Sequence, residues 1–235
     1  MKPTLFFLHI PKTGGMTLNR IATAQYQPEQ LFLIDNGRIT AHFEEFKTWT
    51  RERKEKIQFV SGHMQYSNQQ KHFPQNIKFT TVVRDPVDRI VSLFFYIKRE
   101  PVHTLYHKVN EIITNMGAEE ALRHYVFDMK RRDTYNAMTK QISGEKVAFG
   151  EDSREIYEKS IENIEKDFIS VGNLKHYNKY LDFFTKNYKW RIGNIKRENT
   201  GKNKQKIPKK LLDEIRELNY YDQKLYEYIG KGIYE

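Results

Sequence analysis

A lysine and two glycines follow an apolar run near the start of the chain. Residues 5–10 read Leu-Phe-Phe-Leu-His-Ile, and residues 11–17 read Pro-Lys-Thr-Gly-Gly-Met-Thr. Glycines let the backbone fold closely around an anion, amides at the start of a following helix point toward it, and Lys12 adds a positive charge. The segment predicts a phosphate-binding loop, although a Gly-Gly turn that merely joins two elements would also fit.

The order of the residues in this loop differs from that of an ordinary ATP or GTP site. In the Walker A pattern the lysine follows the glycines, whereas Lys12 precedes Gly14 and Gly15, and Pro11 stands before it. A conventional nucleoside triphosphate site is therefore disfavoured.

Two further apolar runs also end in residues that could do chemistry. The run 57–60 is followed by Ser-Gly-His, and the β-branched run 77–83 is followed by Arg-Asp-Pro. Arg84 could offer a bidentate fork to a phosphate, and His63 has the near-neutral pKa that a general base needs. Each residue has a simpler alternative, since Arg84 could pair with a neighbouring aspartate and a single histidine near an apolar run is usually structural.

Alternating strands and helices must bring these positions together. We expect strands over residues 5–10, 31–34, 57–60, 77–83 and 168–172, and helices over residues 16–24, 43–56 and 87–99, with Pro86 in the first turn of the last. This alternation predicts an α/β fold with a central parallel sheet flanked by helices, in which ligands bind at the carboxyl ends of the strands. From about residue 102 the chain reads mainly as helices.

Composition limits the class of protein and of partner. The 235 residues fit a single domain over 1–235, and 40 Lys and Arg against 30 Asp and Glu give a net charge of +10. Such a charge favours an anionic partner without choosing between a nucleotide, an acidic glycan and RNA, and it would equally serve solubility. The absence of cysteine excludes disulfides, thiolate nucleophiles and cysteine metal sites.

A second basic feature lies late in the chain. Residues 196–210 contain seven basic residues and one acidic residue, Glu198. This segment could close over an anionic ligand or could be a solvated surface stretch. Near the start of the chain, the apolar run 5–10 is too short to cross a membrane and leads into the glycine turn. We therefore expect neither a targeting segment nor a membrane span. We expect a cytoplasmic location.

Several motifs, taken together, resemble those of one family. They are residues 9–15 (His-Ile-Pro-Lys-Thr-Gly-Gly), the pair Gly62-His63 and residues 83–96 (Val-Arg-Asp-Pro-Val-Asp-Arg-Ile-Val-Ser-Leu-Phe-Phe-Tyr), with support from residues 136–144, 171–172 and 219–226. The chain resembles the carbohydrate sulfotransferases that use 3′-phosphoadenosine 5′-phosphosulfate (PAPS), in particular the heparan sulfate 2-O-sulfotransferase-like branch of sulfotransferase family 2 and its bacterial members. The resemblance implies the sulfotransferase variant of the fold of P-loop nucleotide kinases.

The resemblance also implies a role for each motif. In such proteins the first loop holds the 5′-phosphosulfate of PAPS, an arginine and a serine hold the 3′-phosphate, and a late loop lies near the nucleotide. The corresponding donor-binding residues here are Lys12, Thr13, Gly14, Gly15, Met16, Thr17, Arg84, Ser92, Thr200 and Lys202. Lys12 would stabilise the charge on the leaving phosphate, and His63 would take the proton of the acceptor hydroxyl.

The resemblance implies an acceptor that bears a hydroxyl, in particular a saccharide or polysaccharide precursor. For the protein itself it implies no metal, no nucleic-acid partner and no membrane segment. The related 2-O enzymes often carry a second histidine at the position of Ser61. We expect His9 to be a packed histidine, with Glu44 and Glu45 as reserve bases. A phosphate-loop nucleotide kinase and a non-catalytic basic module that binds glycans are the alternatives.

Overall fold

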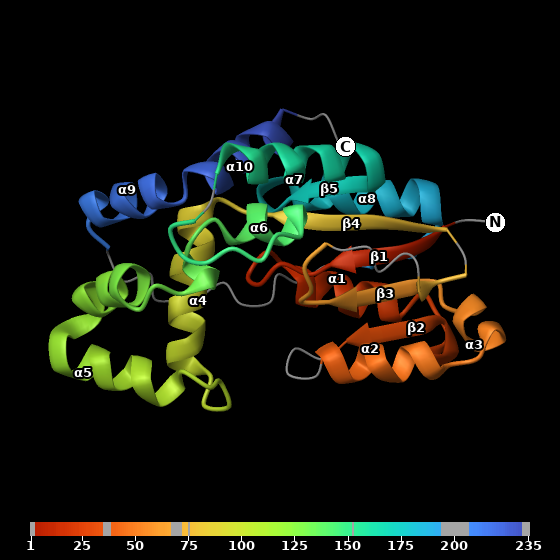
Figure 1. Cartoon of the computed structure of the whole chain (residues 1–235), viewed down its shortest axis with the longest axis horizontal. Coiled ribbons are helices and arrows are strands. Elements are labelled where there is room, and N and C mark those ends of the chain that lie inside the picture. Colours follow the sequence, from red (N-terminus) through yellow and green to blue (C-terminus); the bar gives the residue numbers. More distant parts are fainter. Residues whose placement is uncertain are drawn as a thin grey trace.

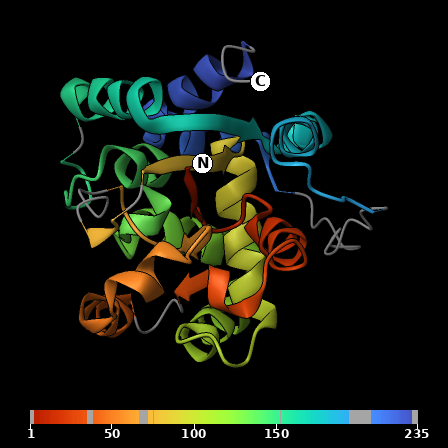
Figure 2. The ribbon, with the colours of Figure 1, turned by 90° about the vertical axis from the view of Figure 1, so that its right-hand side faces the viewer.

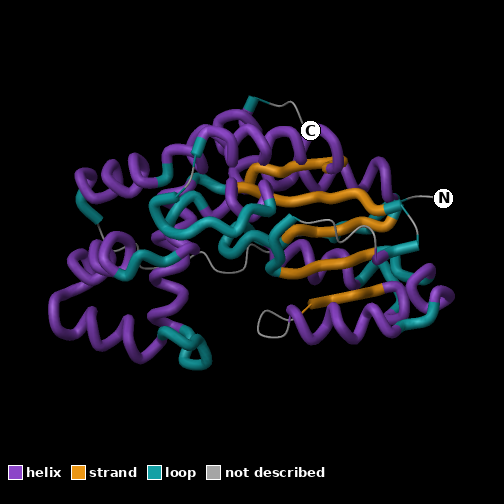
Figure 3. Tube along the Cα trace, in the orientation of Figure 1, coloured by secondary structure: helices purple, strands orange, loops and turns teal. Residues whose placement is uncertain are grey.

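A parallel sheet forms the centre of the computed structural model, which describes residues 3–34, 39–66, 72–74, 76–151, 153–193 and 207–231. Its strands are β1 (Thr4–Leu8), β2 (Leu31–Ile34), β3 (Phe59–Gly62), β4 (Ile77–Val83) and β5 (Phe168–Asn173). They pair in the order β2-β3-β1-β4-β5, and every pairing is parallel (Figures 1 and 3). The expected parallel sheet is confirmed.

The helices have the following bounds: α1 (Gly15–Thr23), α2 (Ile39–Thr48), α3 (Arg51–Glu55), α4 (Pro86–Arg99), α5 (Tyr106–Arg123), α6 (Ala137–Ser143), α7 (Arg154–Asp167), α8 (Tyr177–Tyr188), α9 (Lys209–Leu218) and α10 (Tyr220–Gly230). Shorter helical turns are η1 (Pro28–Gln30), η3 (His124–Asp128), η4 (Arg132–Thr134) and η5 (Leu174–His176). The second half is mainly helical, as expected, and β5 is the strand that its described part contains.

The helical structure expected for residues 43–56 is confirmed over most of the segment, but one continuous helix does not form there. The chain forms α2 and α3 instead, with a break at Trp49 and Thr50. The Thr50 side chain accepts a hydrogen bond from the Arg53 backbone N–H, so a threonine N-cap starts a new helix there. The charged composition of the segment did not reveal this cap.

Helices cover both faces of the sheet, as the view in Figure 2 shows. On one face, β1 contributes Leu5 and Phe7 to a core with α1 and α8. On the other face, Phe6 and Leu8 pack with side chains of α2, α6, α7 and α10. This alternation of buried side chains along β1 is what a strand covered on both faces requires.

A third apolar cluster lies beyond the carboxyl end of the sheet. Helices α4, α5 and α9 form it together with the η3 turn, and Phe94, Tyr125 and Ile215 are among its fully buried members. The strands run from right to left in Figure 1, so α4 stands between their carboxyl ends and this helical lobe. Helix α4 therefore forms one wall beside the strand ends. Within the described ranges, no helix is both long and apolar enough to cross a membrane.

Candidate functional site

The loop between β1 and α1 is built on left-handed backbone conformations. Lys12 has φ 68° and Gly14 has φ 90°. The Thr13 hydroxyl donates to the Ile10 carbonyl at 2.8 Å, which closes the loop on itself. A Cβ atom on Gly15 would lie 2.0 Å from the His9 ring, so glycine is required for the ring to pack under the loop. The loop leads directly into the first turn of α1, in which the Thr17 N–H donates to the Gly14 carbonyl at 3.1 Å and the N–H groups before it have no acceptor within the helix.

Lys12 places its charge at this loop. Its Nζ atom lies 3.9 Å from the centroid of the Tyr96 ring on α4. Burial, together with the positive charges of Arg84 and Arg99, lowers the pKa of Lys12 to about 8. At neutral pH the ammonium is still mostly charged, and it could meet an anion with little water between them.

Arg84 joins the end of β4 to the same loop. Its Nη1 atom donates to the Lys12 carbonyl at 3.1 Å. A guanidinium carries five N–H donors, so one such bond leaves others for a ligand. The neighbouring Asp85 carboxylate accepts from the Asp88 backbone N–H and thus caps α4, which begins at Pro86 as expected.

Ser92 lies on α4, two turns after its start, and its side chain is half-buried. Residues four apart on a helix share a face, so Ser92 lies on the side of α4 that also carries Tyr96. Because Tyr96 reaches Lys12, this side of α4 is turned toward the loop. Thr17 lies in the first turn of α1, and Met16 next to it has a side chain that is 74% exposed.

His63, at the exit of β3, is held by a backbone carbonyl of β1's extension. Its Nδ1 atom lies 2.8 Å from the His9 carbonyl oxygen. Since that oxygen can only accept, Nδ1 carries the hydrogen and Nε2 of a neutral ring has a free lone pair. Burial lowers the pKa of His63 below its usual value, and the bond to the His9 carbonyl opposes this shift. The ring is thus neutral at pH 7 and oriented to accept a proton at Nε2.

The expectation that His9 is a packed residue is confirmed. His9 is 5% exposed, and its ring stacks on that of His63 with 4.0 Å between the ring centroids. Burial and the neighbouring His63 lower its pKa to about 3, so it stays neutral at any working pH. The reserve base Glu44 pairs with Lys47 on the exposed side of α2, and Glu45 is also exposed there.

Two residues that contact the loop and the His9 carbonyl were not predicted from the sequence. Gln141 of α6 donates to the His9 carbonyl at 3.0 Å, so this oxygen accepts from both Gln141 and His63. Tyr177 of α8 donates to the Gly14 carbonyl at 3.1 Å. Gln141 lies within the supporting motif 136–144, which was the one signal for it. Tyr177 carried no such signal.

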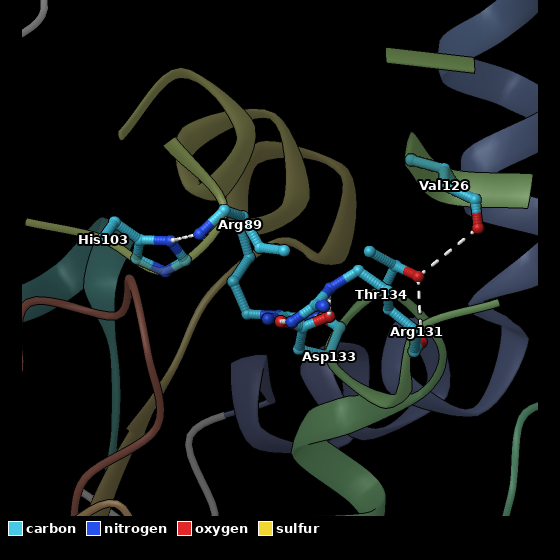
Figure 4. A network of polar contacts seen from close by, with 7 residues as sticks. Arg89, His103, Val126, Arg131, Asp133 and Thr134 are labelled. Carbon is cyan, nitrogen blue, oxygen red and sulfur yellow. Dashed lines mark hydrogen bonds and ion pairs between the residues drawn. The ribbon is translucent and has the colours of Figure 1, made fainter. Parts of the chain in front are cut away.

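Arg89, inside the motif that begins with Arg84, has a different environment. It is 0% exposed, and its Nη2 atom donates to the Asp133 carbonyl at 2.8 Å. Figure 4 shows Arg89 reaching from α4 toward Asp133, whose carboxylate binds Arg131 through two hydrogen bonds. This arginine links α4 to the η4 turn, so the two arginines of one motif have different contacts.

The supporting motifs 136–144 and 219–226 meet in a buried polar network. The Asp222 carboxylate of α10 accepts from the backbone N–H groups of Met138 and Thr139, at 3.1 and 2.8 Å, and so caps α6. The Asn219 side chain accepts from the Asn136 backbone N–H. The network fixes the start of α6, the helix that carries Gln141.

Thr200 and Lys202 lie outside the described residues, as does most of the segment 196–210. Over the ranges that are described, no three His, Asp or Glu side chains are grouped so as to hold a metal ion. The roles of these two residues and independence from metal both remain predictions.

Comparison with known proteins gives one match to a family. The family model described as "Sulfotransferase family" matches residues 2–229. A protein-tyrosine sulfotransferase of Arabidopsis thaliana is 29% identical over 107 residues, which are 46% of this chain and 20% of that protein. The match therefore covers about a fifth of the length of that relative.

Two solved structures are similar at low identity. A mouse sulfotransferase complexed with PAP has 16% identity and a TM-score of 0.43, over 96% of this chain and 66% of that chain. A sulfotransferase from Alicyclobacillus acidocaldarius has 14% identity and a TM-score of 0.48, over 97% and 96% of the two chains.

Proposed function

Because the chain belongs to the sulfotransferase family, we propose that it transfers a sulfuryl group from PAPS to the hydroxyl of an acceptor. The observation that carries this proposal is the meeting of three strand exits at one edge of the sheet. Lys12 follows β1, His63 follows β3 and Arg84 follows β4, and hydrogen bonds tie both His63 and Arg84 to the backbone of residues 9–12.

The donor requires two anion sites, and the chain offers residues for both. The loop of residues 12–17 suits the 5′-phosphosulfate, since it combines amides at a helix start with the Lys12 ammonium. Arg84 and Ser92 suit the 3′-phosphate, the former through its remaining guanidinium N–H groups and the latter through its hydroxyl. The bond from Arg84 to the Lys12 carbonyl would keep the two sites at a constant separation.

The transfer itself needs an in-line arrangement and two charge adjustments. The acceptor oxygen forms a bond to sulfur while the bond between sulfur and the phosphate oxygen breaks, which releases 3′-phosphoadenosine 5′-phosphate (PAP). His63 Nε2 accepts the proton of the acceptor hydroxyl. The Lys12 ammonium stabilises the charge that develops on the leaving phosphate. Ser61 occupies the position where the related 2-O enzymes often carry a second histidine, and its hydroxyl donates to the Asn19 side-chain oxygen at 2.7 Å.

A saccharide is the acceptor class that we propose. Support comes from the resemblance of the motifs to carbohydrate sulfotransferases and from the net charge of +10, which suits an acidic glycan. The Arabidopsis relative is named for a tyrosine acceptor, so the phenol of a tyrosine is the competing class. A panel of saccharides and tyrosine peptides with sulfur-labelled PAPS would separate the two.

Calorimetric titration with PAP tests the donor site. We expect PAP to bind, AMP and ATP with magnesium to bind far more weakly, and Arg84→Ala to remove the preference for the 3′-phosphate, because a bidentate charged contact is lost. Arg154→Ala, an exposed arginine on α7, is the matched control and should bind PAP normally. Absence of PAP binding in the unaltered protein, or preference for ATP with magnesium, would overturn the proposal and favour a kinase.

A further inference from the structure

Tyr96 and Lys12 form a contact that the proposed chemistry leaves unexplained. The Lys12 Nζ atom lies 3.9 Å from the centroid of the Tyr96 ring, well inside the distance at which a cation is attracted to a ring face. Tyr96 extends from α4, whereas Lys12 follows β1, so the contact crosses from the helical wall to the donor loop. Tyr96 is half-buried, which limits screening of the contact by water.

The charges around Lys12 give this contact its importance. Arg84 and Arg99 both act on the ammonium as like charges, and His9 and His63 at the same strand ends are neutral at pH 7. Burial, and to a smaller extent the charge of Glu100, raises the pKa of the Tyr96 phenol and keeps it protonated. Among the described contacts of the Lys12 ammonium, the electron-rich group is thus the ring face of Tyr96.

We propose that Tyr96 is a positioning residue for Lys12, whose ring face holds the ammonium charged and directed at the donor loop. The inference rests on the proposed function, because it assigns Lys12 to the leaving phosphate. A purely structural role is the alternative, since the Tyr96 ring also packs against the cluster of α4, α5 and α9 and lies edge-on to His103.

The titration of Lys12 distinguishes these roles without an acceptor. In the full-length protein, Lys12 would be acetylated with trace acetic anhydride at a series of pH values and the modified peptide quantified by mass spectrometry. Leucine keeps an apolar group over the ammonium but removes the ring. We therefore expect Tyr96→Leu to shift the Lys12 midpoint about half to one pH unit toward acid, from the attraction of a partly buried ring.

The matched variants sharpen the result. Tyr96→Phe keeps the ring face and should titrate as the unaltered protein does. Phe95→Leu removes an aromatic ring one residue away on α4, whose described contacts lie in the cluster of α4, α5 and α9, and should leave Lys12 unchanged. An unmoved or raised midpoint in Tyr96→Leu would overturn the proposal, because the ring would then serve as packing or cover.

Fluorinated phenylalanines at position 96 keep the proposal testable if Tyr96→Leu does not fold. They preserve the shape of the ring and withdraw charge from its face, so the Lys12 midpoint should fall stepwise with fluorine number. A constant midpoint along this series would again reject the ring as the cause. Calorimetry with PAP on the same proteins distinguishes failure of the proposed function from failure of the Tyr96 proposal. If the unaltered protein does not bind PAP, the donor site is rejected, while the Lys12 titration still reports the ring contact.

Discussion

His63 derives its expected role from one hydrogen bond. Donation from Nδ1 to the His9 carbonyl leaves Nε2 as the acceptor, which is the tautomer that a general base requires. The stacked His9 ring supports the His63 ring from one side. This geometry leaves Nε2 able to accept the proton of the acceptor hydroxyl, as the proposed role requires.

Replacing His63 tests that assignment. We expect His63→Ala to lower turnover by about two to four powers of ten, the usual contribution of a general base, while PAP affinity by calorimetry is retained. The exposed His176→Ala on η5 serves as the control and should be fully active. An equal loss of PAP binding in His63→Ala would point to a structural histidine.

The pH dependence of turnover follows from His63 and Lys12 together. His63 must be neutral and its pKa lies below 6.5, so turnover should fall as the pH drops below that range. Lys12 must be charged and its pKa is about 8, so turnover should also fall above about pH 8. A bell-shaped profile with its maximum near neutrality is the expected result. Lys12→Arg should remove the alkaline limb, because a guanidinium stays charged there. An alkaline limb unchanged in that variant would assign it to another group.

At the scale of elements, the β1–α1 loop depends on the close contact of Gly15 with His9. Gly15→Ala would place a Cβ atom 2.0 Å from the His9 ring and push that ring against His63. We expect a loss of about 1–3 kcal/mol in the free energy of unfolding and at least a tenfold loss of turnover. Gly193→Ala, at a site with nothing within 4 Å, should change neither quantity. Normal activity of Gly15→Ala would show that the site does not depend on the packing of His9.

Helix α6 depends on a cap supplied from another element. Asp222→Ala would leave the backbone N–H groups of Met138 and Thr139 without their acceptor in a buried place. We expect a destabilisation of roughly 2–4 kcal/mol in urea unfolding, with Asp222→Asn in between. Asp213→Ala, which breaks a partly exposed pair with Arg216, should cost well under 1 kcal/mol. Equal stabilities of the Asp222 and Asp213 variants would refute the cap as an important interaction.

At the scale of the whole molecule, three apolar clusters stabilise different parts of the fold. Two of them pack on the two faces of the sheet, and the third holds α4, α5 and α9 together beyond the carboxyl ends of the strands. Helix α4 belongs to the third cluster and also presents Tyr96 to Lys12 of the β1–α1 loop. The residues proposed for the reaction therefore lie where a rigid sheet edge meets a helical wall.

The sequence by itself determined the sheet, the β1–α1 loop and the strand exits that carry Lys12, His63 and Arg84. These features follow from local rules, since apolar runs form strands and glycine or proline marks where strands end. The break at Thr50 escaped notice because a single cap within a charged stretch decided it. Only the tertiary structure determined the tautomer of His63, the contact of Tyr96 with Lys12 and the cap of α6 by Asp222. Each of these joins residues more than 50 positions apart, and Gln141 reaches the His9 carbonyl across 132. Spacing along the chain carries no information about which carbonyl or ring such side chains will meet, because that depends on how the helices pack on the sheet.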